Sequence, residues 1–213
     1  MPSPEKAGQQ GHRTVKGRWR LLGLLAVCAA PVIASYFTYY VVRPEGRRNY
    51  GELVEPQRPL PAIAATALDG KSGSLAALRG QWLLVSVASG SCDAACEKHL
   101  YLQRQLREGL GKDKERMDWV WLVLDDTPVR AALLPALSQA AVLRVRAGEL
   151  AAWLQPAAGH QLHEHLYLVD PLGNLMMRFP ASLDQSSAAQ AKRDLDRLMR
   201  ASAGWDKPGR ELR

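Results

Sequence analysis

One stretch of the sequence decides the fold of this chain, and it reads Trp82-Leu83-Leu84-Val85-Ser86-Val87-Ala88, then Ser91-Cys92-Asp93-Ala94-Ala95-Cys96. The first seven residues are nearly all apolar, which is typical of a buried strand. From Asp93 to Gly109 the chain mixes polar and apolar residues at helical spacing, which predicts a helix. A Cys-x-x-x-Cys pair therefore stands where a buried strand ends and a helix begins.

Two thiols at this place can be activated together. Cys92 stands at the expected start of the helix, where unpaired backbone N–H groups and the helix dipole favour a thiolate. Cys96 follows four residues later, on the same helix face. Such a pair can bind one soft metal ion or form a disulfide. The loop between the two residues is too short to stabilise the fold as a crosslink. We therefore expect a chemical role, the alternative being two small buried residues.

A second informative segment is Leu21–Val42, which contains 22 residues and no charge. About 20 apolar residues are enough to span a bilayer. The segment ends in tyrosines, at Tyr36, Tyr39 and Tyr40, which are typical of a membrane interface. We expect an uncleaved single-pass helix. Two alternatives are a signal peptide cleaved near residues 32–34 and a lipid attached to Cys28.

The net charge of +7 is concentrated beside this apolar segment. Residues 1–20 contain five basic side chains and one acidic one, and residues 43–50 contain three basic and one acidic. Only one positive charge in excess is left for residues 51–213. The positive-inside rule places the N-terminus in the cytoplasm and the rest of the chain on the other side. The excess charge flanks the membrane, so it gives no case for nucleic-acid binding.

These patterns divide the chain into five parts. We expect a cytoplasmic N-terminal tail over residues 1–20, a transmembrane helix over 21–42, a linker with four prolines over 43–61, an exported domain over 62–202 and a C-terminal tail over 203–213.

Strands and helices alternate along the exported domain. Strands are expected at Ala62–Leu68, Trp82–Val87, Met117–Leu124, His165–Asp170 and Leu175–Phe179. Helices or helical turns are expected at Ser74–Leu78, Asp93–Gly109, Pro128–Ala140, Leu150–Leu154 and Ala188–Arg200. This order predicts an α/β fold, a thioredoxin-like mixed sheet flanked by helices. A domain of this size can bury an adequate core without crosslinks.

Several runs carry a resemblance to known proteins. Leu68-Asp69-Gly70, the run from Ser74 to Val85 and the cysteine pair resemble the thioredoxin superfamily. The three-residue gap between the cysteines and the run Leu166-Tyr167-Leu168-Val169-Asp170-Pro171-Leu172-Gly173-Asn174 are similar to the Sco family. Sco proteins are membrane-anchored thioredoxin-fold proteins that carry copper for building the Cu-A centre of cytochrome c oxidase. The resemblance covers roughly residues 62–200 and the topology.

The resemblance implies a copper site built from both cysteines and one histidine. The cysteines correspond to Cys92 and Cys96. The histidine should precede the Tyr-Leu-Val-Asp-Pro strand, where this chain offers His160, His163 and His165. His165 directly enters the strand and is the first candidate ligand, with His163 the second. Thioredoxins have a proline before this strand, whereas residues 159–165 contain none, and this favours metal binding over purely redox chemistry.

The chain departs from the Sco pattern at two positions. Leu162 stands where the family usually has its histidine, and Glu97 stands where it usually has a proline. The resemblance still implies an assembly factor or metallochaperone, not a turnover enzyme, in the bacterial inner membrane with its domain in the periplasm. The implied partners are the oxidase subunit that carries Cu-A or its assembly factors. The protein would act on them by delivering copper or by reducing the copper-site cysteines.

Two other functions remain open on the residues alone. One is a membrane-tethered thiol–disulfide oxidoreductase in which Cys92 and Cys96 are catalytic. The other is a structural assembly factor whose cysteines no longer act. Copper binding requires a histidine beside both thiols, oxidoreduction requires only the cysteines, and a structural role requires neither.

We expect ordinary structural roles for three further features. His99 follows Cys96 by three residues, and we expect it to face solvent from its helix. Asp125-Asp126 ends a central strand, where a capping or turn role is expected. Trp119 and Trp121 alternate along that strand and should lie on one face of it, in the core.

Overall fold

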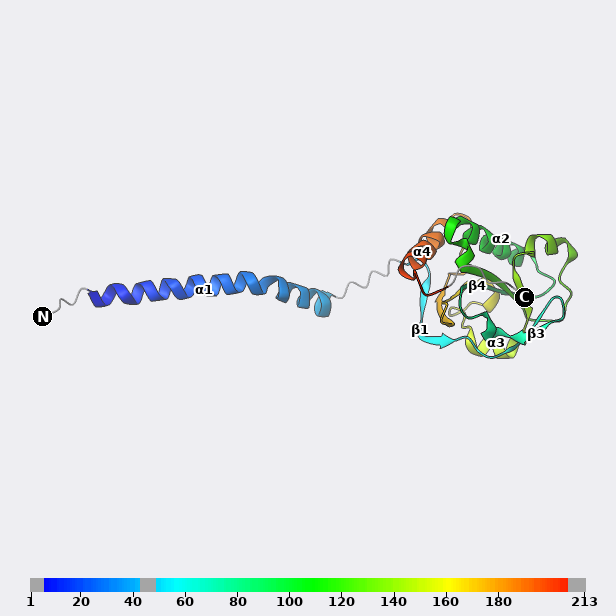
Figure 1. Cartoon of the computed structure of the whole chain (residues 1–213), viewed down its shortest axis with the longest axis horizontal. Coiled ribbons are helices and arrows are strands. Elements are labelled where there is room, and N and C mark those ends of the chain that lie inside the picture. The colour runs from blue at the N-terminus through cyan, green and yellow to red at the C-terminus, as the bar shows by residue number, and fades with distance from the viewer. Residues whose placement is uncertain (1–5, 43–48, 207–213) are drawn as a thin grey trace. The chain divides into compact units, whose positions relative to one another are not determined.

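The structure is a computed structural model that describes residues 6–42 and 49–206. The chain divides into two units, Met1–Arg48 and Asn49–Arg213 (Figure 1). The first unit contains helix α1, Lys6–Phe37, which continues as the π-helical segment Thr38–Val42. The span Gly17–Val41 is long and apolar enough to cross a membrane, and it is not buried against protein. The expected single-pass anchor therefore has a suitable helix.

Helix α1 begins well before the apolar segment that the sequence marks out. It starts at Lys6, whereas the predicted transmembrane helix starts at Leu21. The intervening residues include arginine, lysine and glutamine, which are good helix formers, so the helix extends into the polar tail. Residues 1–5 of the expected cytoplasmic tail, 43–48 of the expected linker and 207–213 of the expected C-terminal tail lie outside the described residues.

The second unit is built on one eight-stranded sheet, in the order β1-β8-β7-β4-β5-β6-β2-β3. The strands are β1 Glu52–Pro59, β2 Ala64–Ala67, β3 Ser72–Ser74, β4 Trp82–Ala88, β5 Met117–Val123, β6 Ala141–Arg144, β7 Tyr167–Val169 and β8 Asn174–Arg178. Strand β4 lies in the middle, paired in parallel with β5 and antiparallel with β7. The sheet is therefore mixed, as the order of elements predicts.

Helices cover both faces of this sheet. The α-helices are α2 Ala94–Gly109, α3 Ala147–Trp153 and α4 Ala188–Ala201. The 3-10 helices are η2 Leu75–Leu78, η3 Gly111–Arg116, η4 Ala131–Leu137 and η5 Leu162–Glu164. Figure 1 shows α2 and α4 together on one side of the strands, with α3 on the other.

The period-two alternation of β4 divides the core between the two faces. Trp82 and Leu84 pack with apolar residues of α2 and α4. Leu83, Val85 and Val87 pack instead in the cluster that includes α3. Successive strand residues point to opposite faces, so a strand buried on both sides is apolar throughout. This explains why the run from Trp82 to Ala88 is apolar at every position except Ser86.

One correction concerns the segment predicted as a linker. Residues 52–59 form β1, which pairs with β8 through contacts such as Leu53 opposite Met177. Its prolines are tolerated because β1 is the edge strand, where a missing N–H on the outer side breaks no ladder bond. The backbone N–H groups of Tyr50 and Gly51 donate to the carboxylate of Asp194 on α4, at 2.6 and 2.9 Å. The folded domain therefore starts earlier than residue 62.

A second correction concerns the helix predicted over Pro128–Ala140. The structure has only the 3-10 helix η4 there, followed by strand β6. The residues just after the predicted helix form a short strand that was not predicted, with Ala141 opposite Val120 and Val142 opposite Trp121 on β5. That pairing is non-local, so helical periodicity in the local sequence did not reveal it.

Candidate functional site

Cys92 and Cys96 form a disulfide at the end of β4, with their Cα atoms 5.2 Å apart. Cys96 lies in the first turn of α2, whereas Cys92 precedes the helix and has a positive φ of 45°. Asp93 is the N-cap, and its carboxylate accepts a hydrogen bond of 2.9 Å from the backbone N–H of Cys96. The pair therefore stands where β4 ends and α2 begins, as predicted, with Cys92 just before the Asp93 cap.

The turn that carries Cys92 is fixed by Asp125, which follows β5. Its carboxylate accepts hydrogen bonds from the Ser89 hydroxyl at 2.5 Å, the Gly90 N–H at 2.9 Å and the Thr127 N–H at 3.3 Å. These bonds, the one from Ser89 first, lower the pKa of the Asp125 carboxyl. A Cβ atom at Gly90 would collide with the Thr127 carbonyl oxygen. The turn role expected for Asp125 is confirmed.

An apolar cluster surrounds the disulfide. Cys92 and Cys96 pack with Trp119 and Trp121 of β5 and with Leu137 of η4. Both tryptophans are buried, as the alternation along the strand predicts. The two cysteines are themselves buried, with 2 % and 7 % of their surface exposed. Burial among apolar side chains raises the free energy of a thiolate, so this environment favours the uncharged disulfide over two thiolates.

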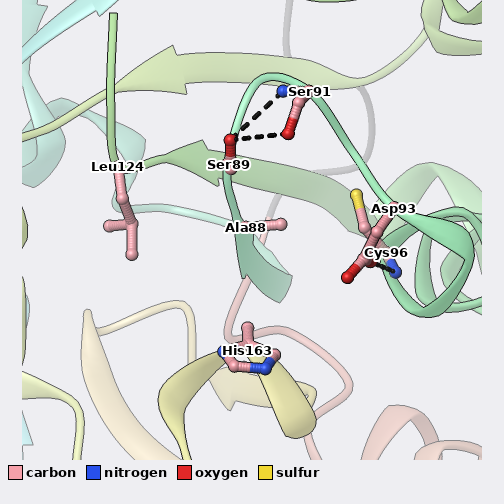
Figure 2. Close-up of a pocket in the computed structure, with 7 residues that line it drawn as sticks. All are labelled: Ala88, Ser89, Ser91, Asp93, Cys96, Leu124 and His163. Atoms are coloured by element: carbon pink, nitrogen blue, oxygen red, sulfur yellow. Dashed lines mark hydrogen bonds between the residues drawn. The ribbon is translucent and has the colours of Figure 1, made fainter. Parts of the chain in front are cut away.

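A pocket of about 320 Å³ opens beside the disulfide. It is lined by Ala88, Ser89, Ser91, Asp93, Cys96, Leu124 and His163 (Figure 2). In Figure 2 His163, on η5, lies below Ala88, and Cys96 lies to the right of Ala88. The structure therefore brings one predicted cysteine and one predicted histidine to the same pocket.

His165 lies elsewhere, although the sequence made it the first candidate ligand. It is 1 % exposed, and both ring nitrogens have partners. Nε2 accepts from the Ala157 N–H at 3.1 Å, and Nδ1 donates to the Phe179 carbonyl at 2.9 Å. Burial lowers the pKa of this imidazole. His165 is thus a core histidine that holds two loops together, and His163 is the histidine that the geometry offers to the cysteines.

The third histidine of this segment, His160, is exposed. Its Nδ1 lies 3.1 Å from the Glu164 carboxylate. Its ring packs edge-on against His165, with 5.6 Å between the ring centroids. Both histidines line a separate cavity of about 200 Å³, away from the residues that surround Cys96.

His99 corrects another expectation, since it was predicted to face solvent. It is buried, with 8 % of its surface exposed. Burial is the largest cause of its lowered pKa, and a hydrogen bond with the backbone of His163 opposes that shift. His99 therefore connects α2 to the segment that carries His163. Its position three residues after Cys96 was the only signal in the sequence, because it placed both residues on nearly one helix face.

The donor set fits a soft metal ion only in the reduced protein. Within residues 6–42 and 49–206, no three His, Cys, Asp or Glu side chains are grouped to hold a metal. A disulfide has no thiolate to donate. Once reduced, Cys92 and Cys96 would supply two thiolates, and His163, which lines the same pocket as Cys96, would supply an imidazole. This combination of ligands suits Cu(I).

Comparisons with known proteins agree with this architecture. A thiol–disulfide oxidoreductase thioredoxin domain from Bacteroides vulgatus has 17% identity and a TM-score of 0.50, covering 66% of this chain and 95% of that one. A SCO1/SenC family lipoprotein from Bacillus anthracis has 17% identity and a TM-score of 0.51, covering 70% and 99%. Apo Sco1 from Thermus thermophilus has 18% identity and a TM-score of 0.51, covering 72% and 96%.

At these identities the likeness establishes the fold, and the predicted thioredoxin-like fold is confirmed. No curated protein matches the chain in sequence. Residues 82–202, more than half of the chain, match a family described as a transmembrane-like, thioredoxin-like C-terminal domain. The chain belongs to this transmembrane-like, thioredoxin-like family.

Proposed function

We propose that the protein is a membrane-anchored thiol–disulfide exchange protein that acts in cytochrome c oxidase assembly. In this proposal α1 anchors it in the bacterial inner membrane, and the thioredoxin-like domain lies in the periplasm. The domain reduces the cysteines of the oxidase subunit that receives the Cu-A copper. The observation that carries the proposal is the Cys92–Cys96 disulfide at the edge of an open pocket.

The surroundings of the disulfide support exchange chemistry. Cys96 lies in the first turn of α2, where the helix dipole favours a thiolate, while the apolar cluster around the pair disfavours one. The first effect promotes the thiolate that starts an exchange, and the second favours the disulfide that ends it. A third sulfur can approach from the pocket, which a fully enclosed structural disulfide would not allow.

The resemblance to the Sco family supplies the cellular context of the proposal. It rests on the spacing of the two cysteines, on the run from Leu166 to Asn174 and on the single apolar helix ahead of the domain. Cysteines exposed to an oxidising compartment form disulfides unless they are kept reduced, and a disulfide cannot accept copper. Reduction of such cysteines is therefore a step that the assembly of a copper site requires.

The proposal is tested with full-length protein in detergent, carrying Cys28→Ser so that only the pair remains. The reduced protein is mixed with an oxidised peptide containing the two copper-site cysteines of the oxidase subunit. We expect transfer of two electrons, detected as one new Cys92–Cys96 disulfide for each reduced peptide. The matched control is Cys92→Ser/Cys96→Ser. If the peptide is reduced no faster by this protein than by the control, the proposal is contradicted.

A second candidate function is copper transport, and the presence of His163 at the Cys96 pocket favours it. Cu(I) would then be cargo, held by the two thiolates and the His163 imidazole. Reduced protein, kept anaerobic, should bind one copper per chain and lose it with either cysteine. His163→Ala should weaken binding about tenfold, since a neutral ligand is lost. His160→Ala is the control, because His160 lies on the same segment but lines the other cavity. Equal affinities for both histidine variants would contradict this function.

A further inference from the structure

We infer that Cys96, and not Cys92, is the sulfur that forms the mixed disulfide with the partner. The inference rests on the proposed exchange function and names the residue that performs it. The sequence alone favours the opposite order, because Cys92 comes first and stands nearest the expected helix start. The tertiary structure reverses that order through two features.

The first feature is access. Of the two cysteines, Cys96 lines the pocket and Cys92 does not (Figure 2). The exposed fractions agree, with 7 % for Cys96 and 2 % for Cys92. Thiol–disulfide exchange requires the incoming sulfur to reach the sulfur that it attacks, and access decides which of the two is attacked. A partner that enters the pocket meets Cys96.

The second feature is the enclosure of Cys92. Both cysteines pack in the cluster with Trp119 and Trp121, so it is the turn before Cys92 that distinguishes this residue. The turn before it is closed by a hydrogen bond of 3.1 Å from the Cys92 N–H to the Ser89 carbonyl. Asp125 anchors that turn through the Ser89 hydroxyl and the Gly90 N–H, so the turn does not move aside without breaking these bonds.

The exchange then runs in two balanced steps. The Cys96 thiol loses its proton to solvent, and its thiolate attacks one sulfur of the partner's disulfide. That bond breaks, the partner's other sulfur leaves as a thiolate and takes up a proton, and Cys96 is joined to the partner. The Cys92 thiol next loses its proton and attacks Cys96 Sγ. The Cys92–Cys96 disulfide forms, the second partner sulfur leaves, and two electrons have passed to the partner.

The test compares the two thiols within one molecule. Full-length Cys28→Ser protein in detergent is reduced, freed of reductant and treated with limiting iodoacetamide at about pH 7, and the modified peptides are quantified by mass spectrometry. We expect Cys96 to be alkylated about tenfold faster than Cys92. In concentrated urea the two rates should become equal, which shows that the fold causes the difference. Equal rates in the folded protein, or faster alkylation of Cys92, would overturn the inference.

A second measurement separates this inference from the proposed function. Cys92→Ser and Cys96→Ser, each with Cys28→Ser, are mixed with oxidised glutathione and with the oxidase-subunit peptide. The inference predicts that Cys92→Ser, which retains Cys96, forms the glutathione adduct about tenfold faster than Cys96→Ser. If this order holds with glutathione while the peptide does not react, the order of the cysteines stands and the proposed partner is wrong. If Cys96→Ser forms the adduct faster, the inference fails whatever the peptide does.

Discussion

The backbone N–H of Gly90 donates a hydrogen bond of 2.9 Å to the carboxylate of Asp125, a residue 35 positions further along the chain. The same carboxylate accepts a hydrogen bond from the Ser89 hydroxyl. The end of β5 therefore holds the turn that leads to Cys92. Because β4 and β5 run in parallel, both turns emerge at the same edge of the sheet, and one carboxylate can join them.

We expect Asp125→Ala to lower the free energy of unfolding by about 1–3 kcal/mol, because it removes an acceptor shared by three donors. Asp125→Asn should cost less, since its amide oxygen still accepts. Urea unfolding of the oxidised protein measures both values. The matched control is Asp126→Ala at the exposed neighbouring position, with an expected change within about 0.5 kcal/mol. A similar loss in the control would show that the turn does not depend on Asp125.

The lowered pKa of Asp125 also predicts a dependence on pH. The folded state holds this carboxyl below its unfolded pKa of about 3.9, so its contribution to stability is complete above that value. As pH falls through the folded pKa, the carboxyl is protonated and the contribution is lost. Unfolding experiments between about pH 6 and 2 should therefore show a smaller loss of stability for Asp125→Asn than for the parent protein. If the stability of both proteins falls in parallel with pH, the lowered pKa of Asp125 is not the cause.

Gly90→Ala should disturb the turn before Cys92 because its Cβ atom would meet the Thr127 carbonyl oxygen, a backbone atom that cannot rotate away. We expect a destabilisation of about 1–3 kcal/mol, as for other overpacked sites, and slower closure of the disulfide. Gly73→Ala is the control, because an added Cβ meets nothing within 4 Å there. Urea unfolding and the rate of reoxidation by glutathione measure the two effects. Equal changes in the free energy of unfolding for Gly90→Ala and Gly73→Ala would contradict the close approach of Gly90 to the Thr127 carbonyl oxygen.

Two buried histidines predict a second pH effect, near neutrality. Burial lowers the pKa of His99 and of His165 in the folded protein. The unfolded chain binds protons first, at about pH 6.5, so stability is complete above that pH and decreases as pH falls through the window below it. We expect His165→Gln to reduce the slope of stability against pH between about pH 7 and 5. An unchanged slope in His165→Gln would contradict this account.

Trp119 and Trp121 pack in the same cluster as the disulfide, so the redox state should be visible in fluorescence. A disulfide quenches the emission of a tryptophan that it contacts, and a pair of thiols quenches it less. Reduction with dithiothreitol is expected to raise the emission of Cys28→Ser protein. The rise should shrink in Trp119→Phe or Trp121→Phe and be absent in Cys92→Ser/Cys96→Ser. Emission that does not change on reduction would mean that neither ring lies against the disulfide.

The sequence predicted most of the elements that depend on local pattern. The apolar run of β4, the amphipathic α2 and the hairpin of β7 and β8 were all expected close to their observed limits. The edge strands β1 and β3 and the strand β6 were missed. Strands β1 and β6 gain their stability by pairing with a partner far away in the chain, β8 and β5 respectively. Local periodicity carries no record of such a partner.

The same division between local sequence pattern and tertiary contacts applies to the candidate site. The sequence identified both cysteines and the histidine-rich segment, because residue type and spacing are enough to mark donors and thiols. It ranked His165 ahead of His163 from its place at the strand, because neighbours along a chain differ in burial only after the chain is folded. The tertiary structure placed His165 between two backbone groups and His163 at the pocket.

The sequence by itself determined that this chain has an apolar helix long enough for a bilayer, a thioredoxin-like order of elements and a cysteine pair between strand and helix. These features follow from composition and periodicity, which are properties of short segments. Only the tertiary structure decided which sulfur meets the pocket and which histidine faces it. Access and burial arise from contacts between distant segments, here the anchoring of the Cys92 turn by Asp125 and the packing of His99 against the His163 segment.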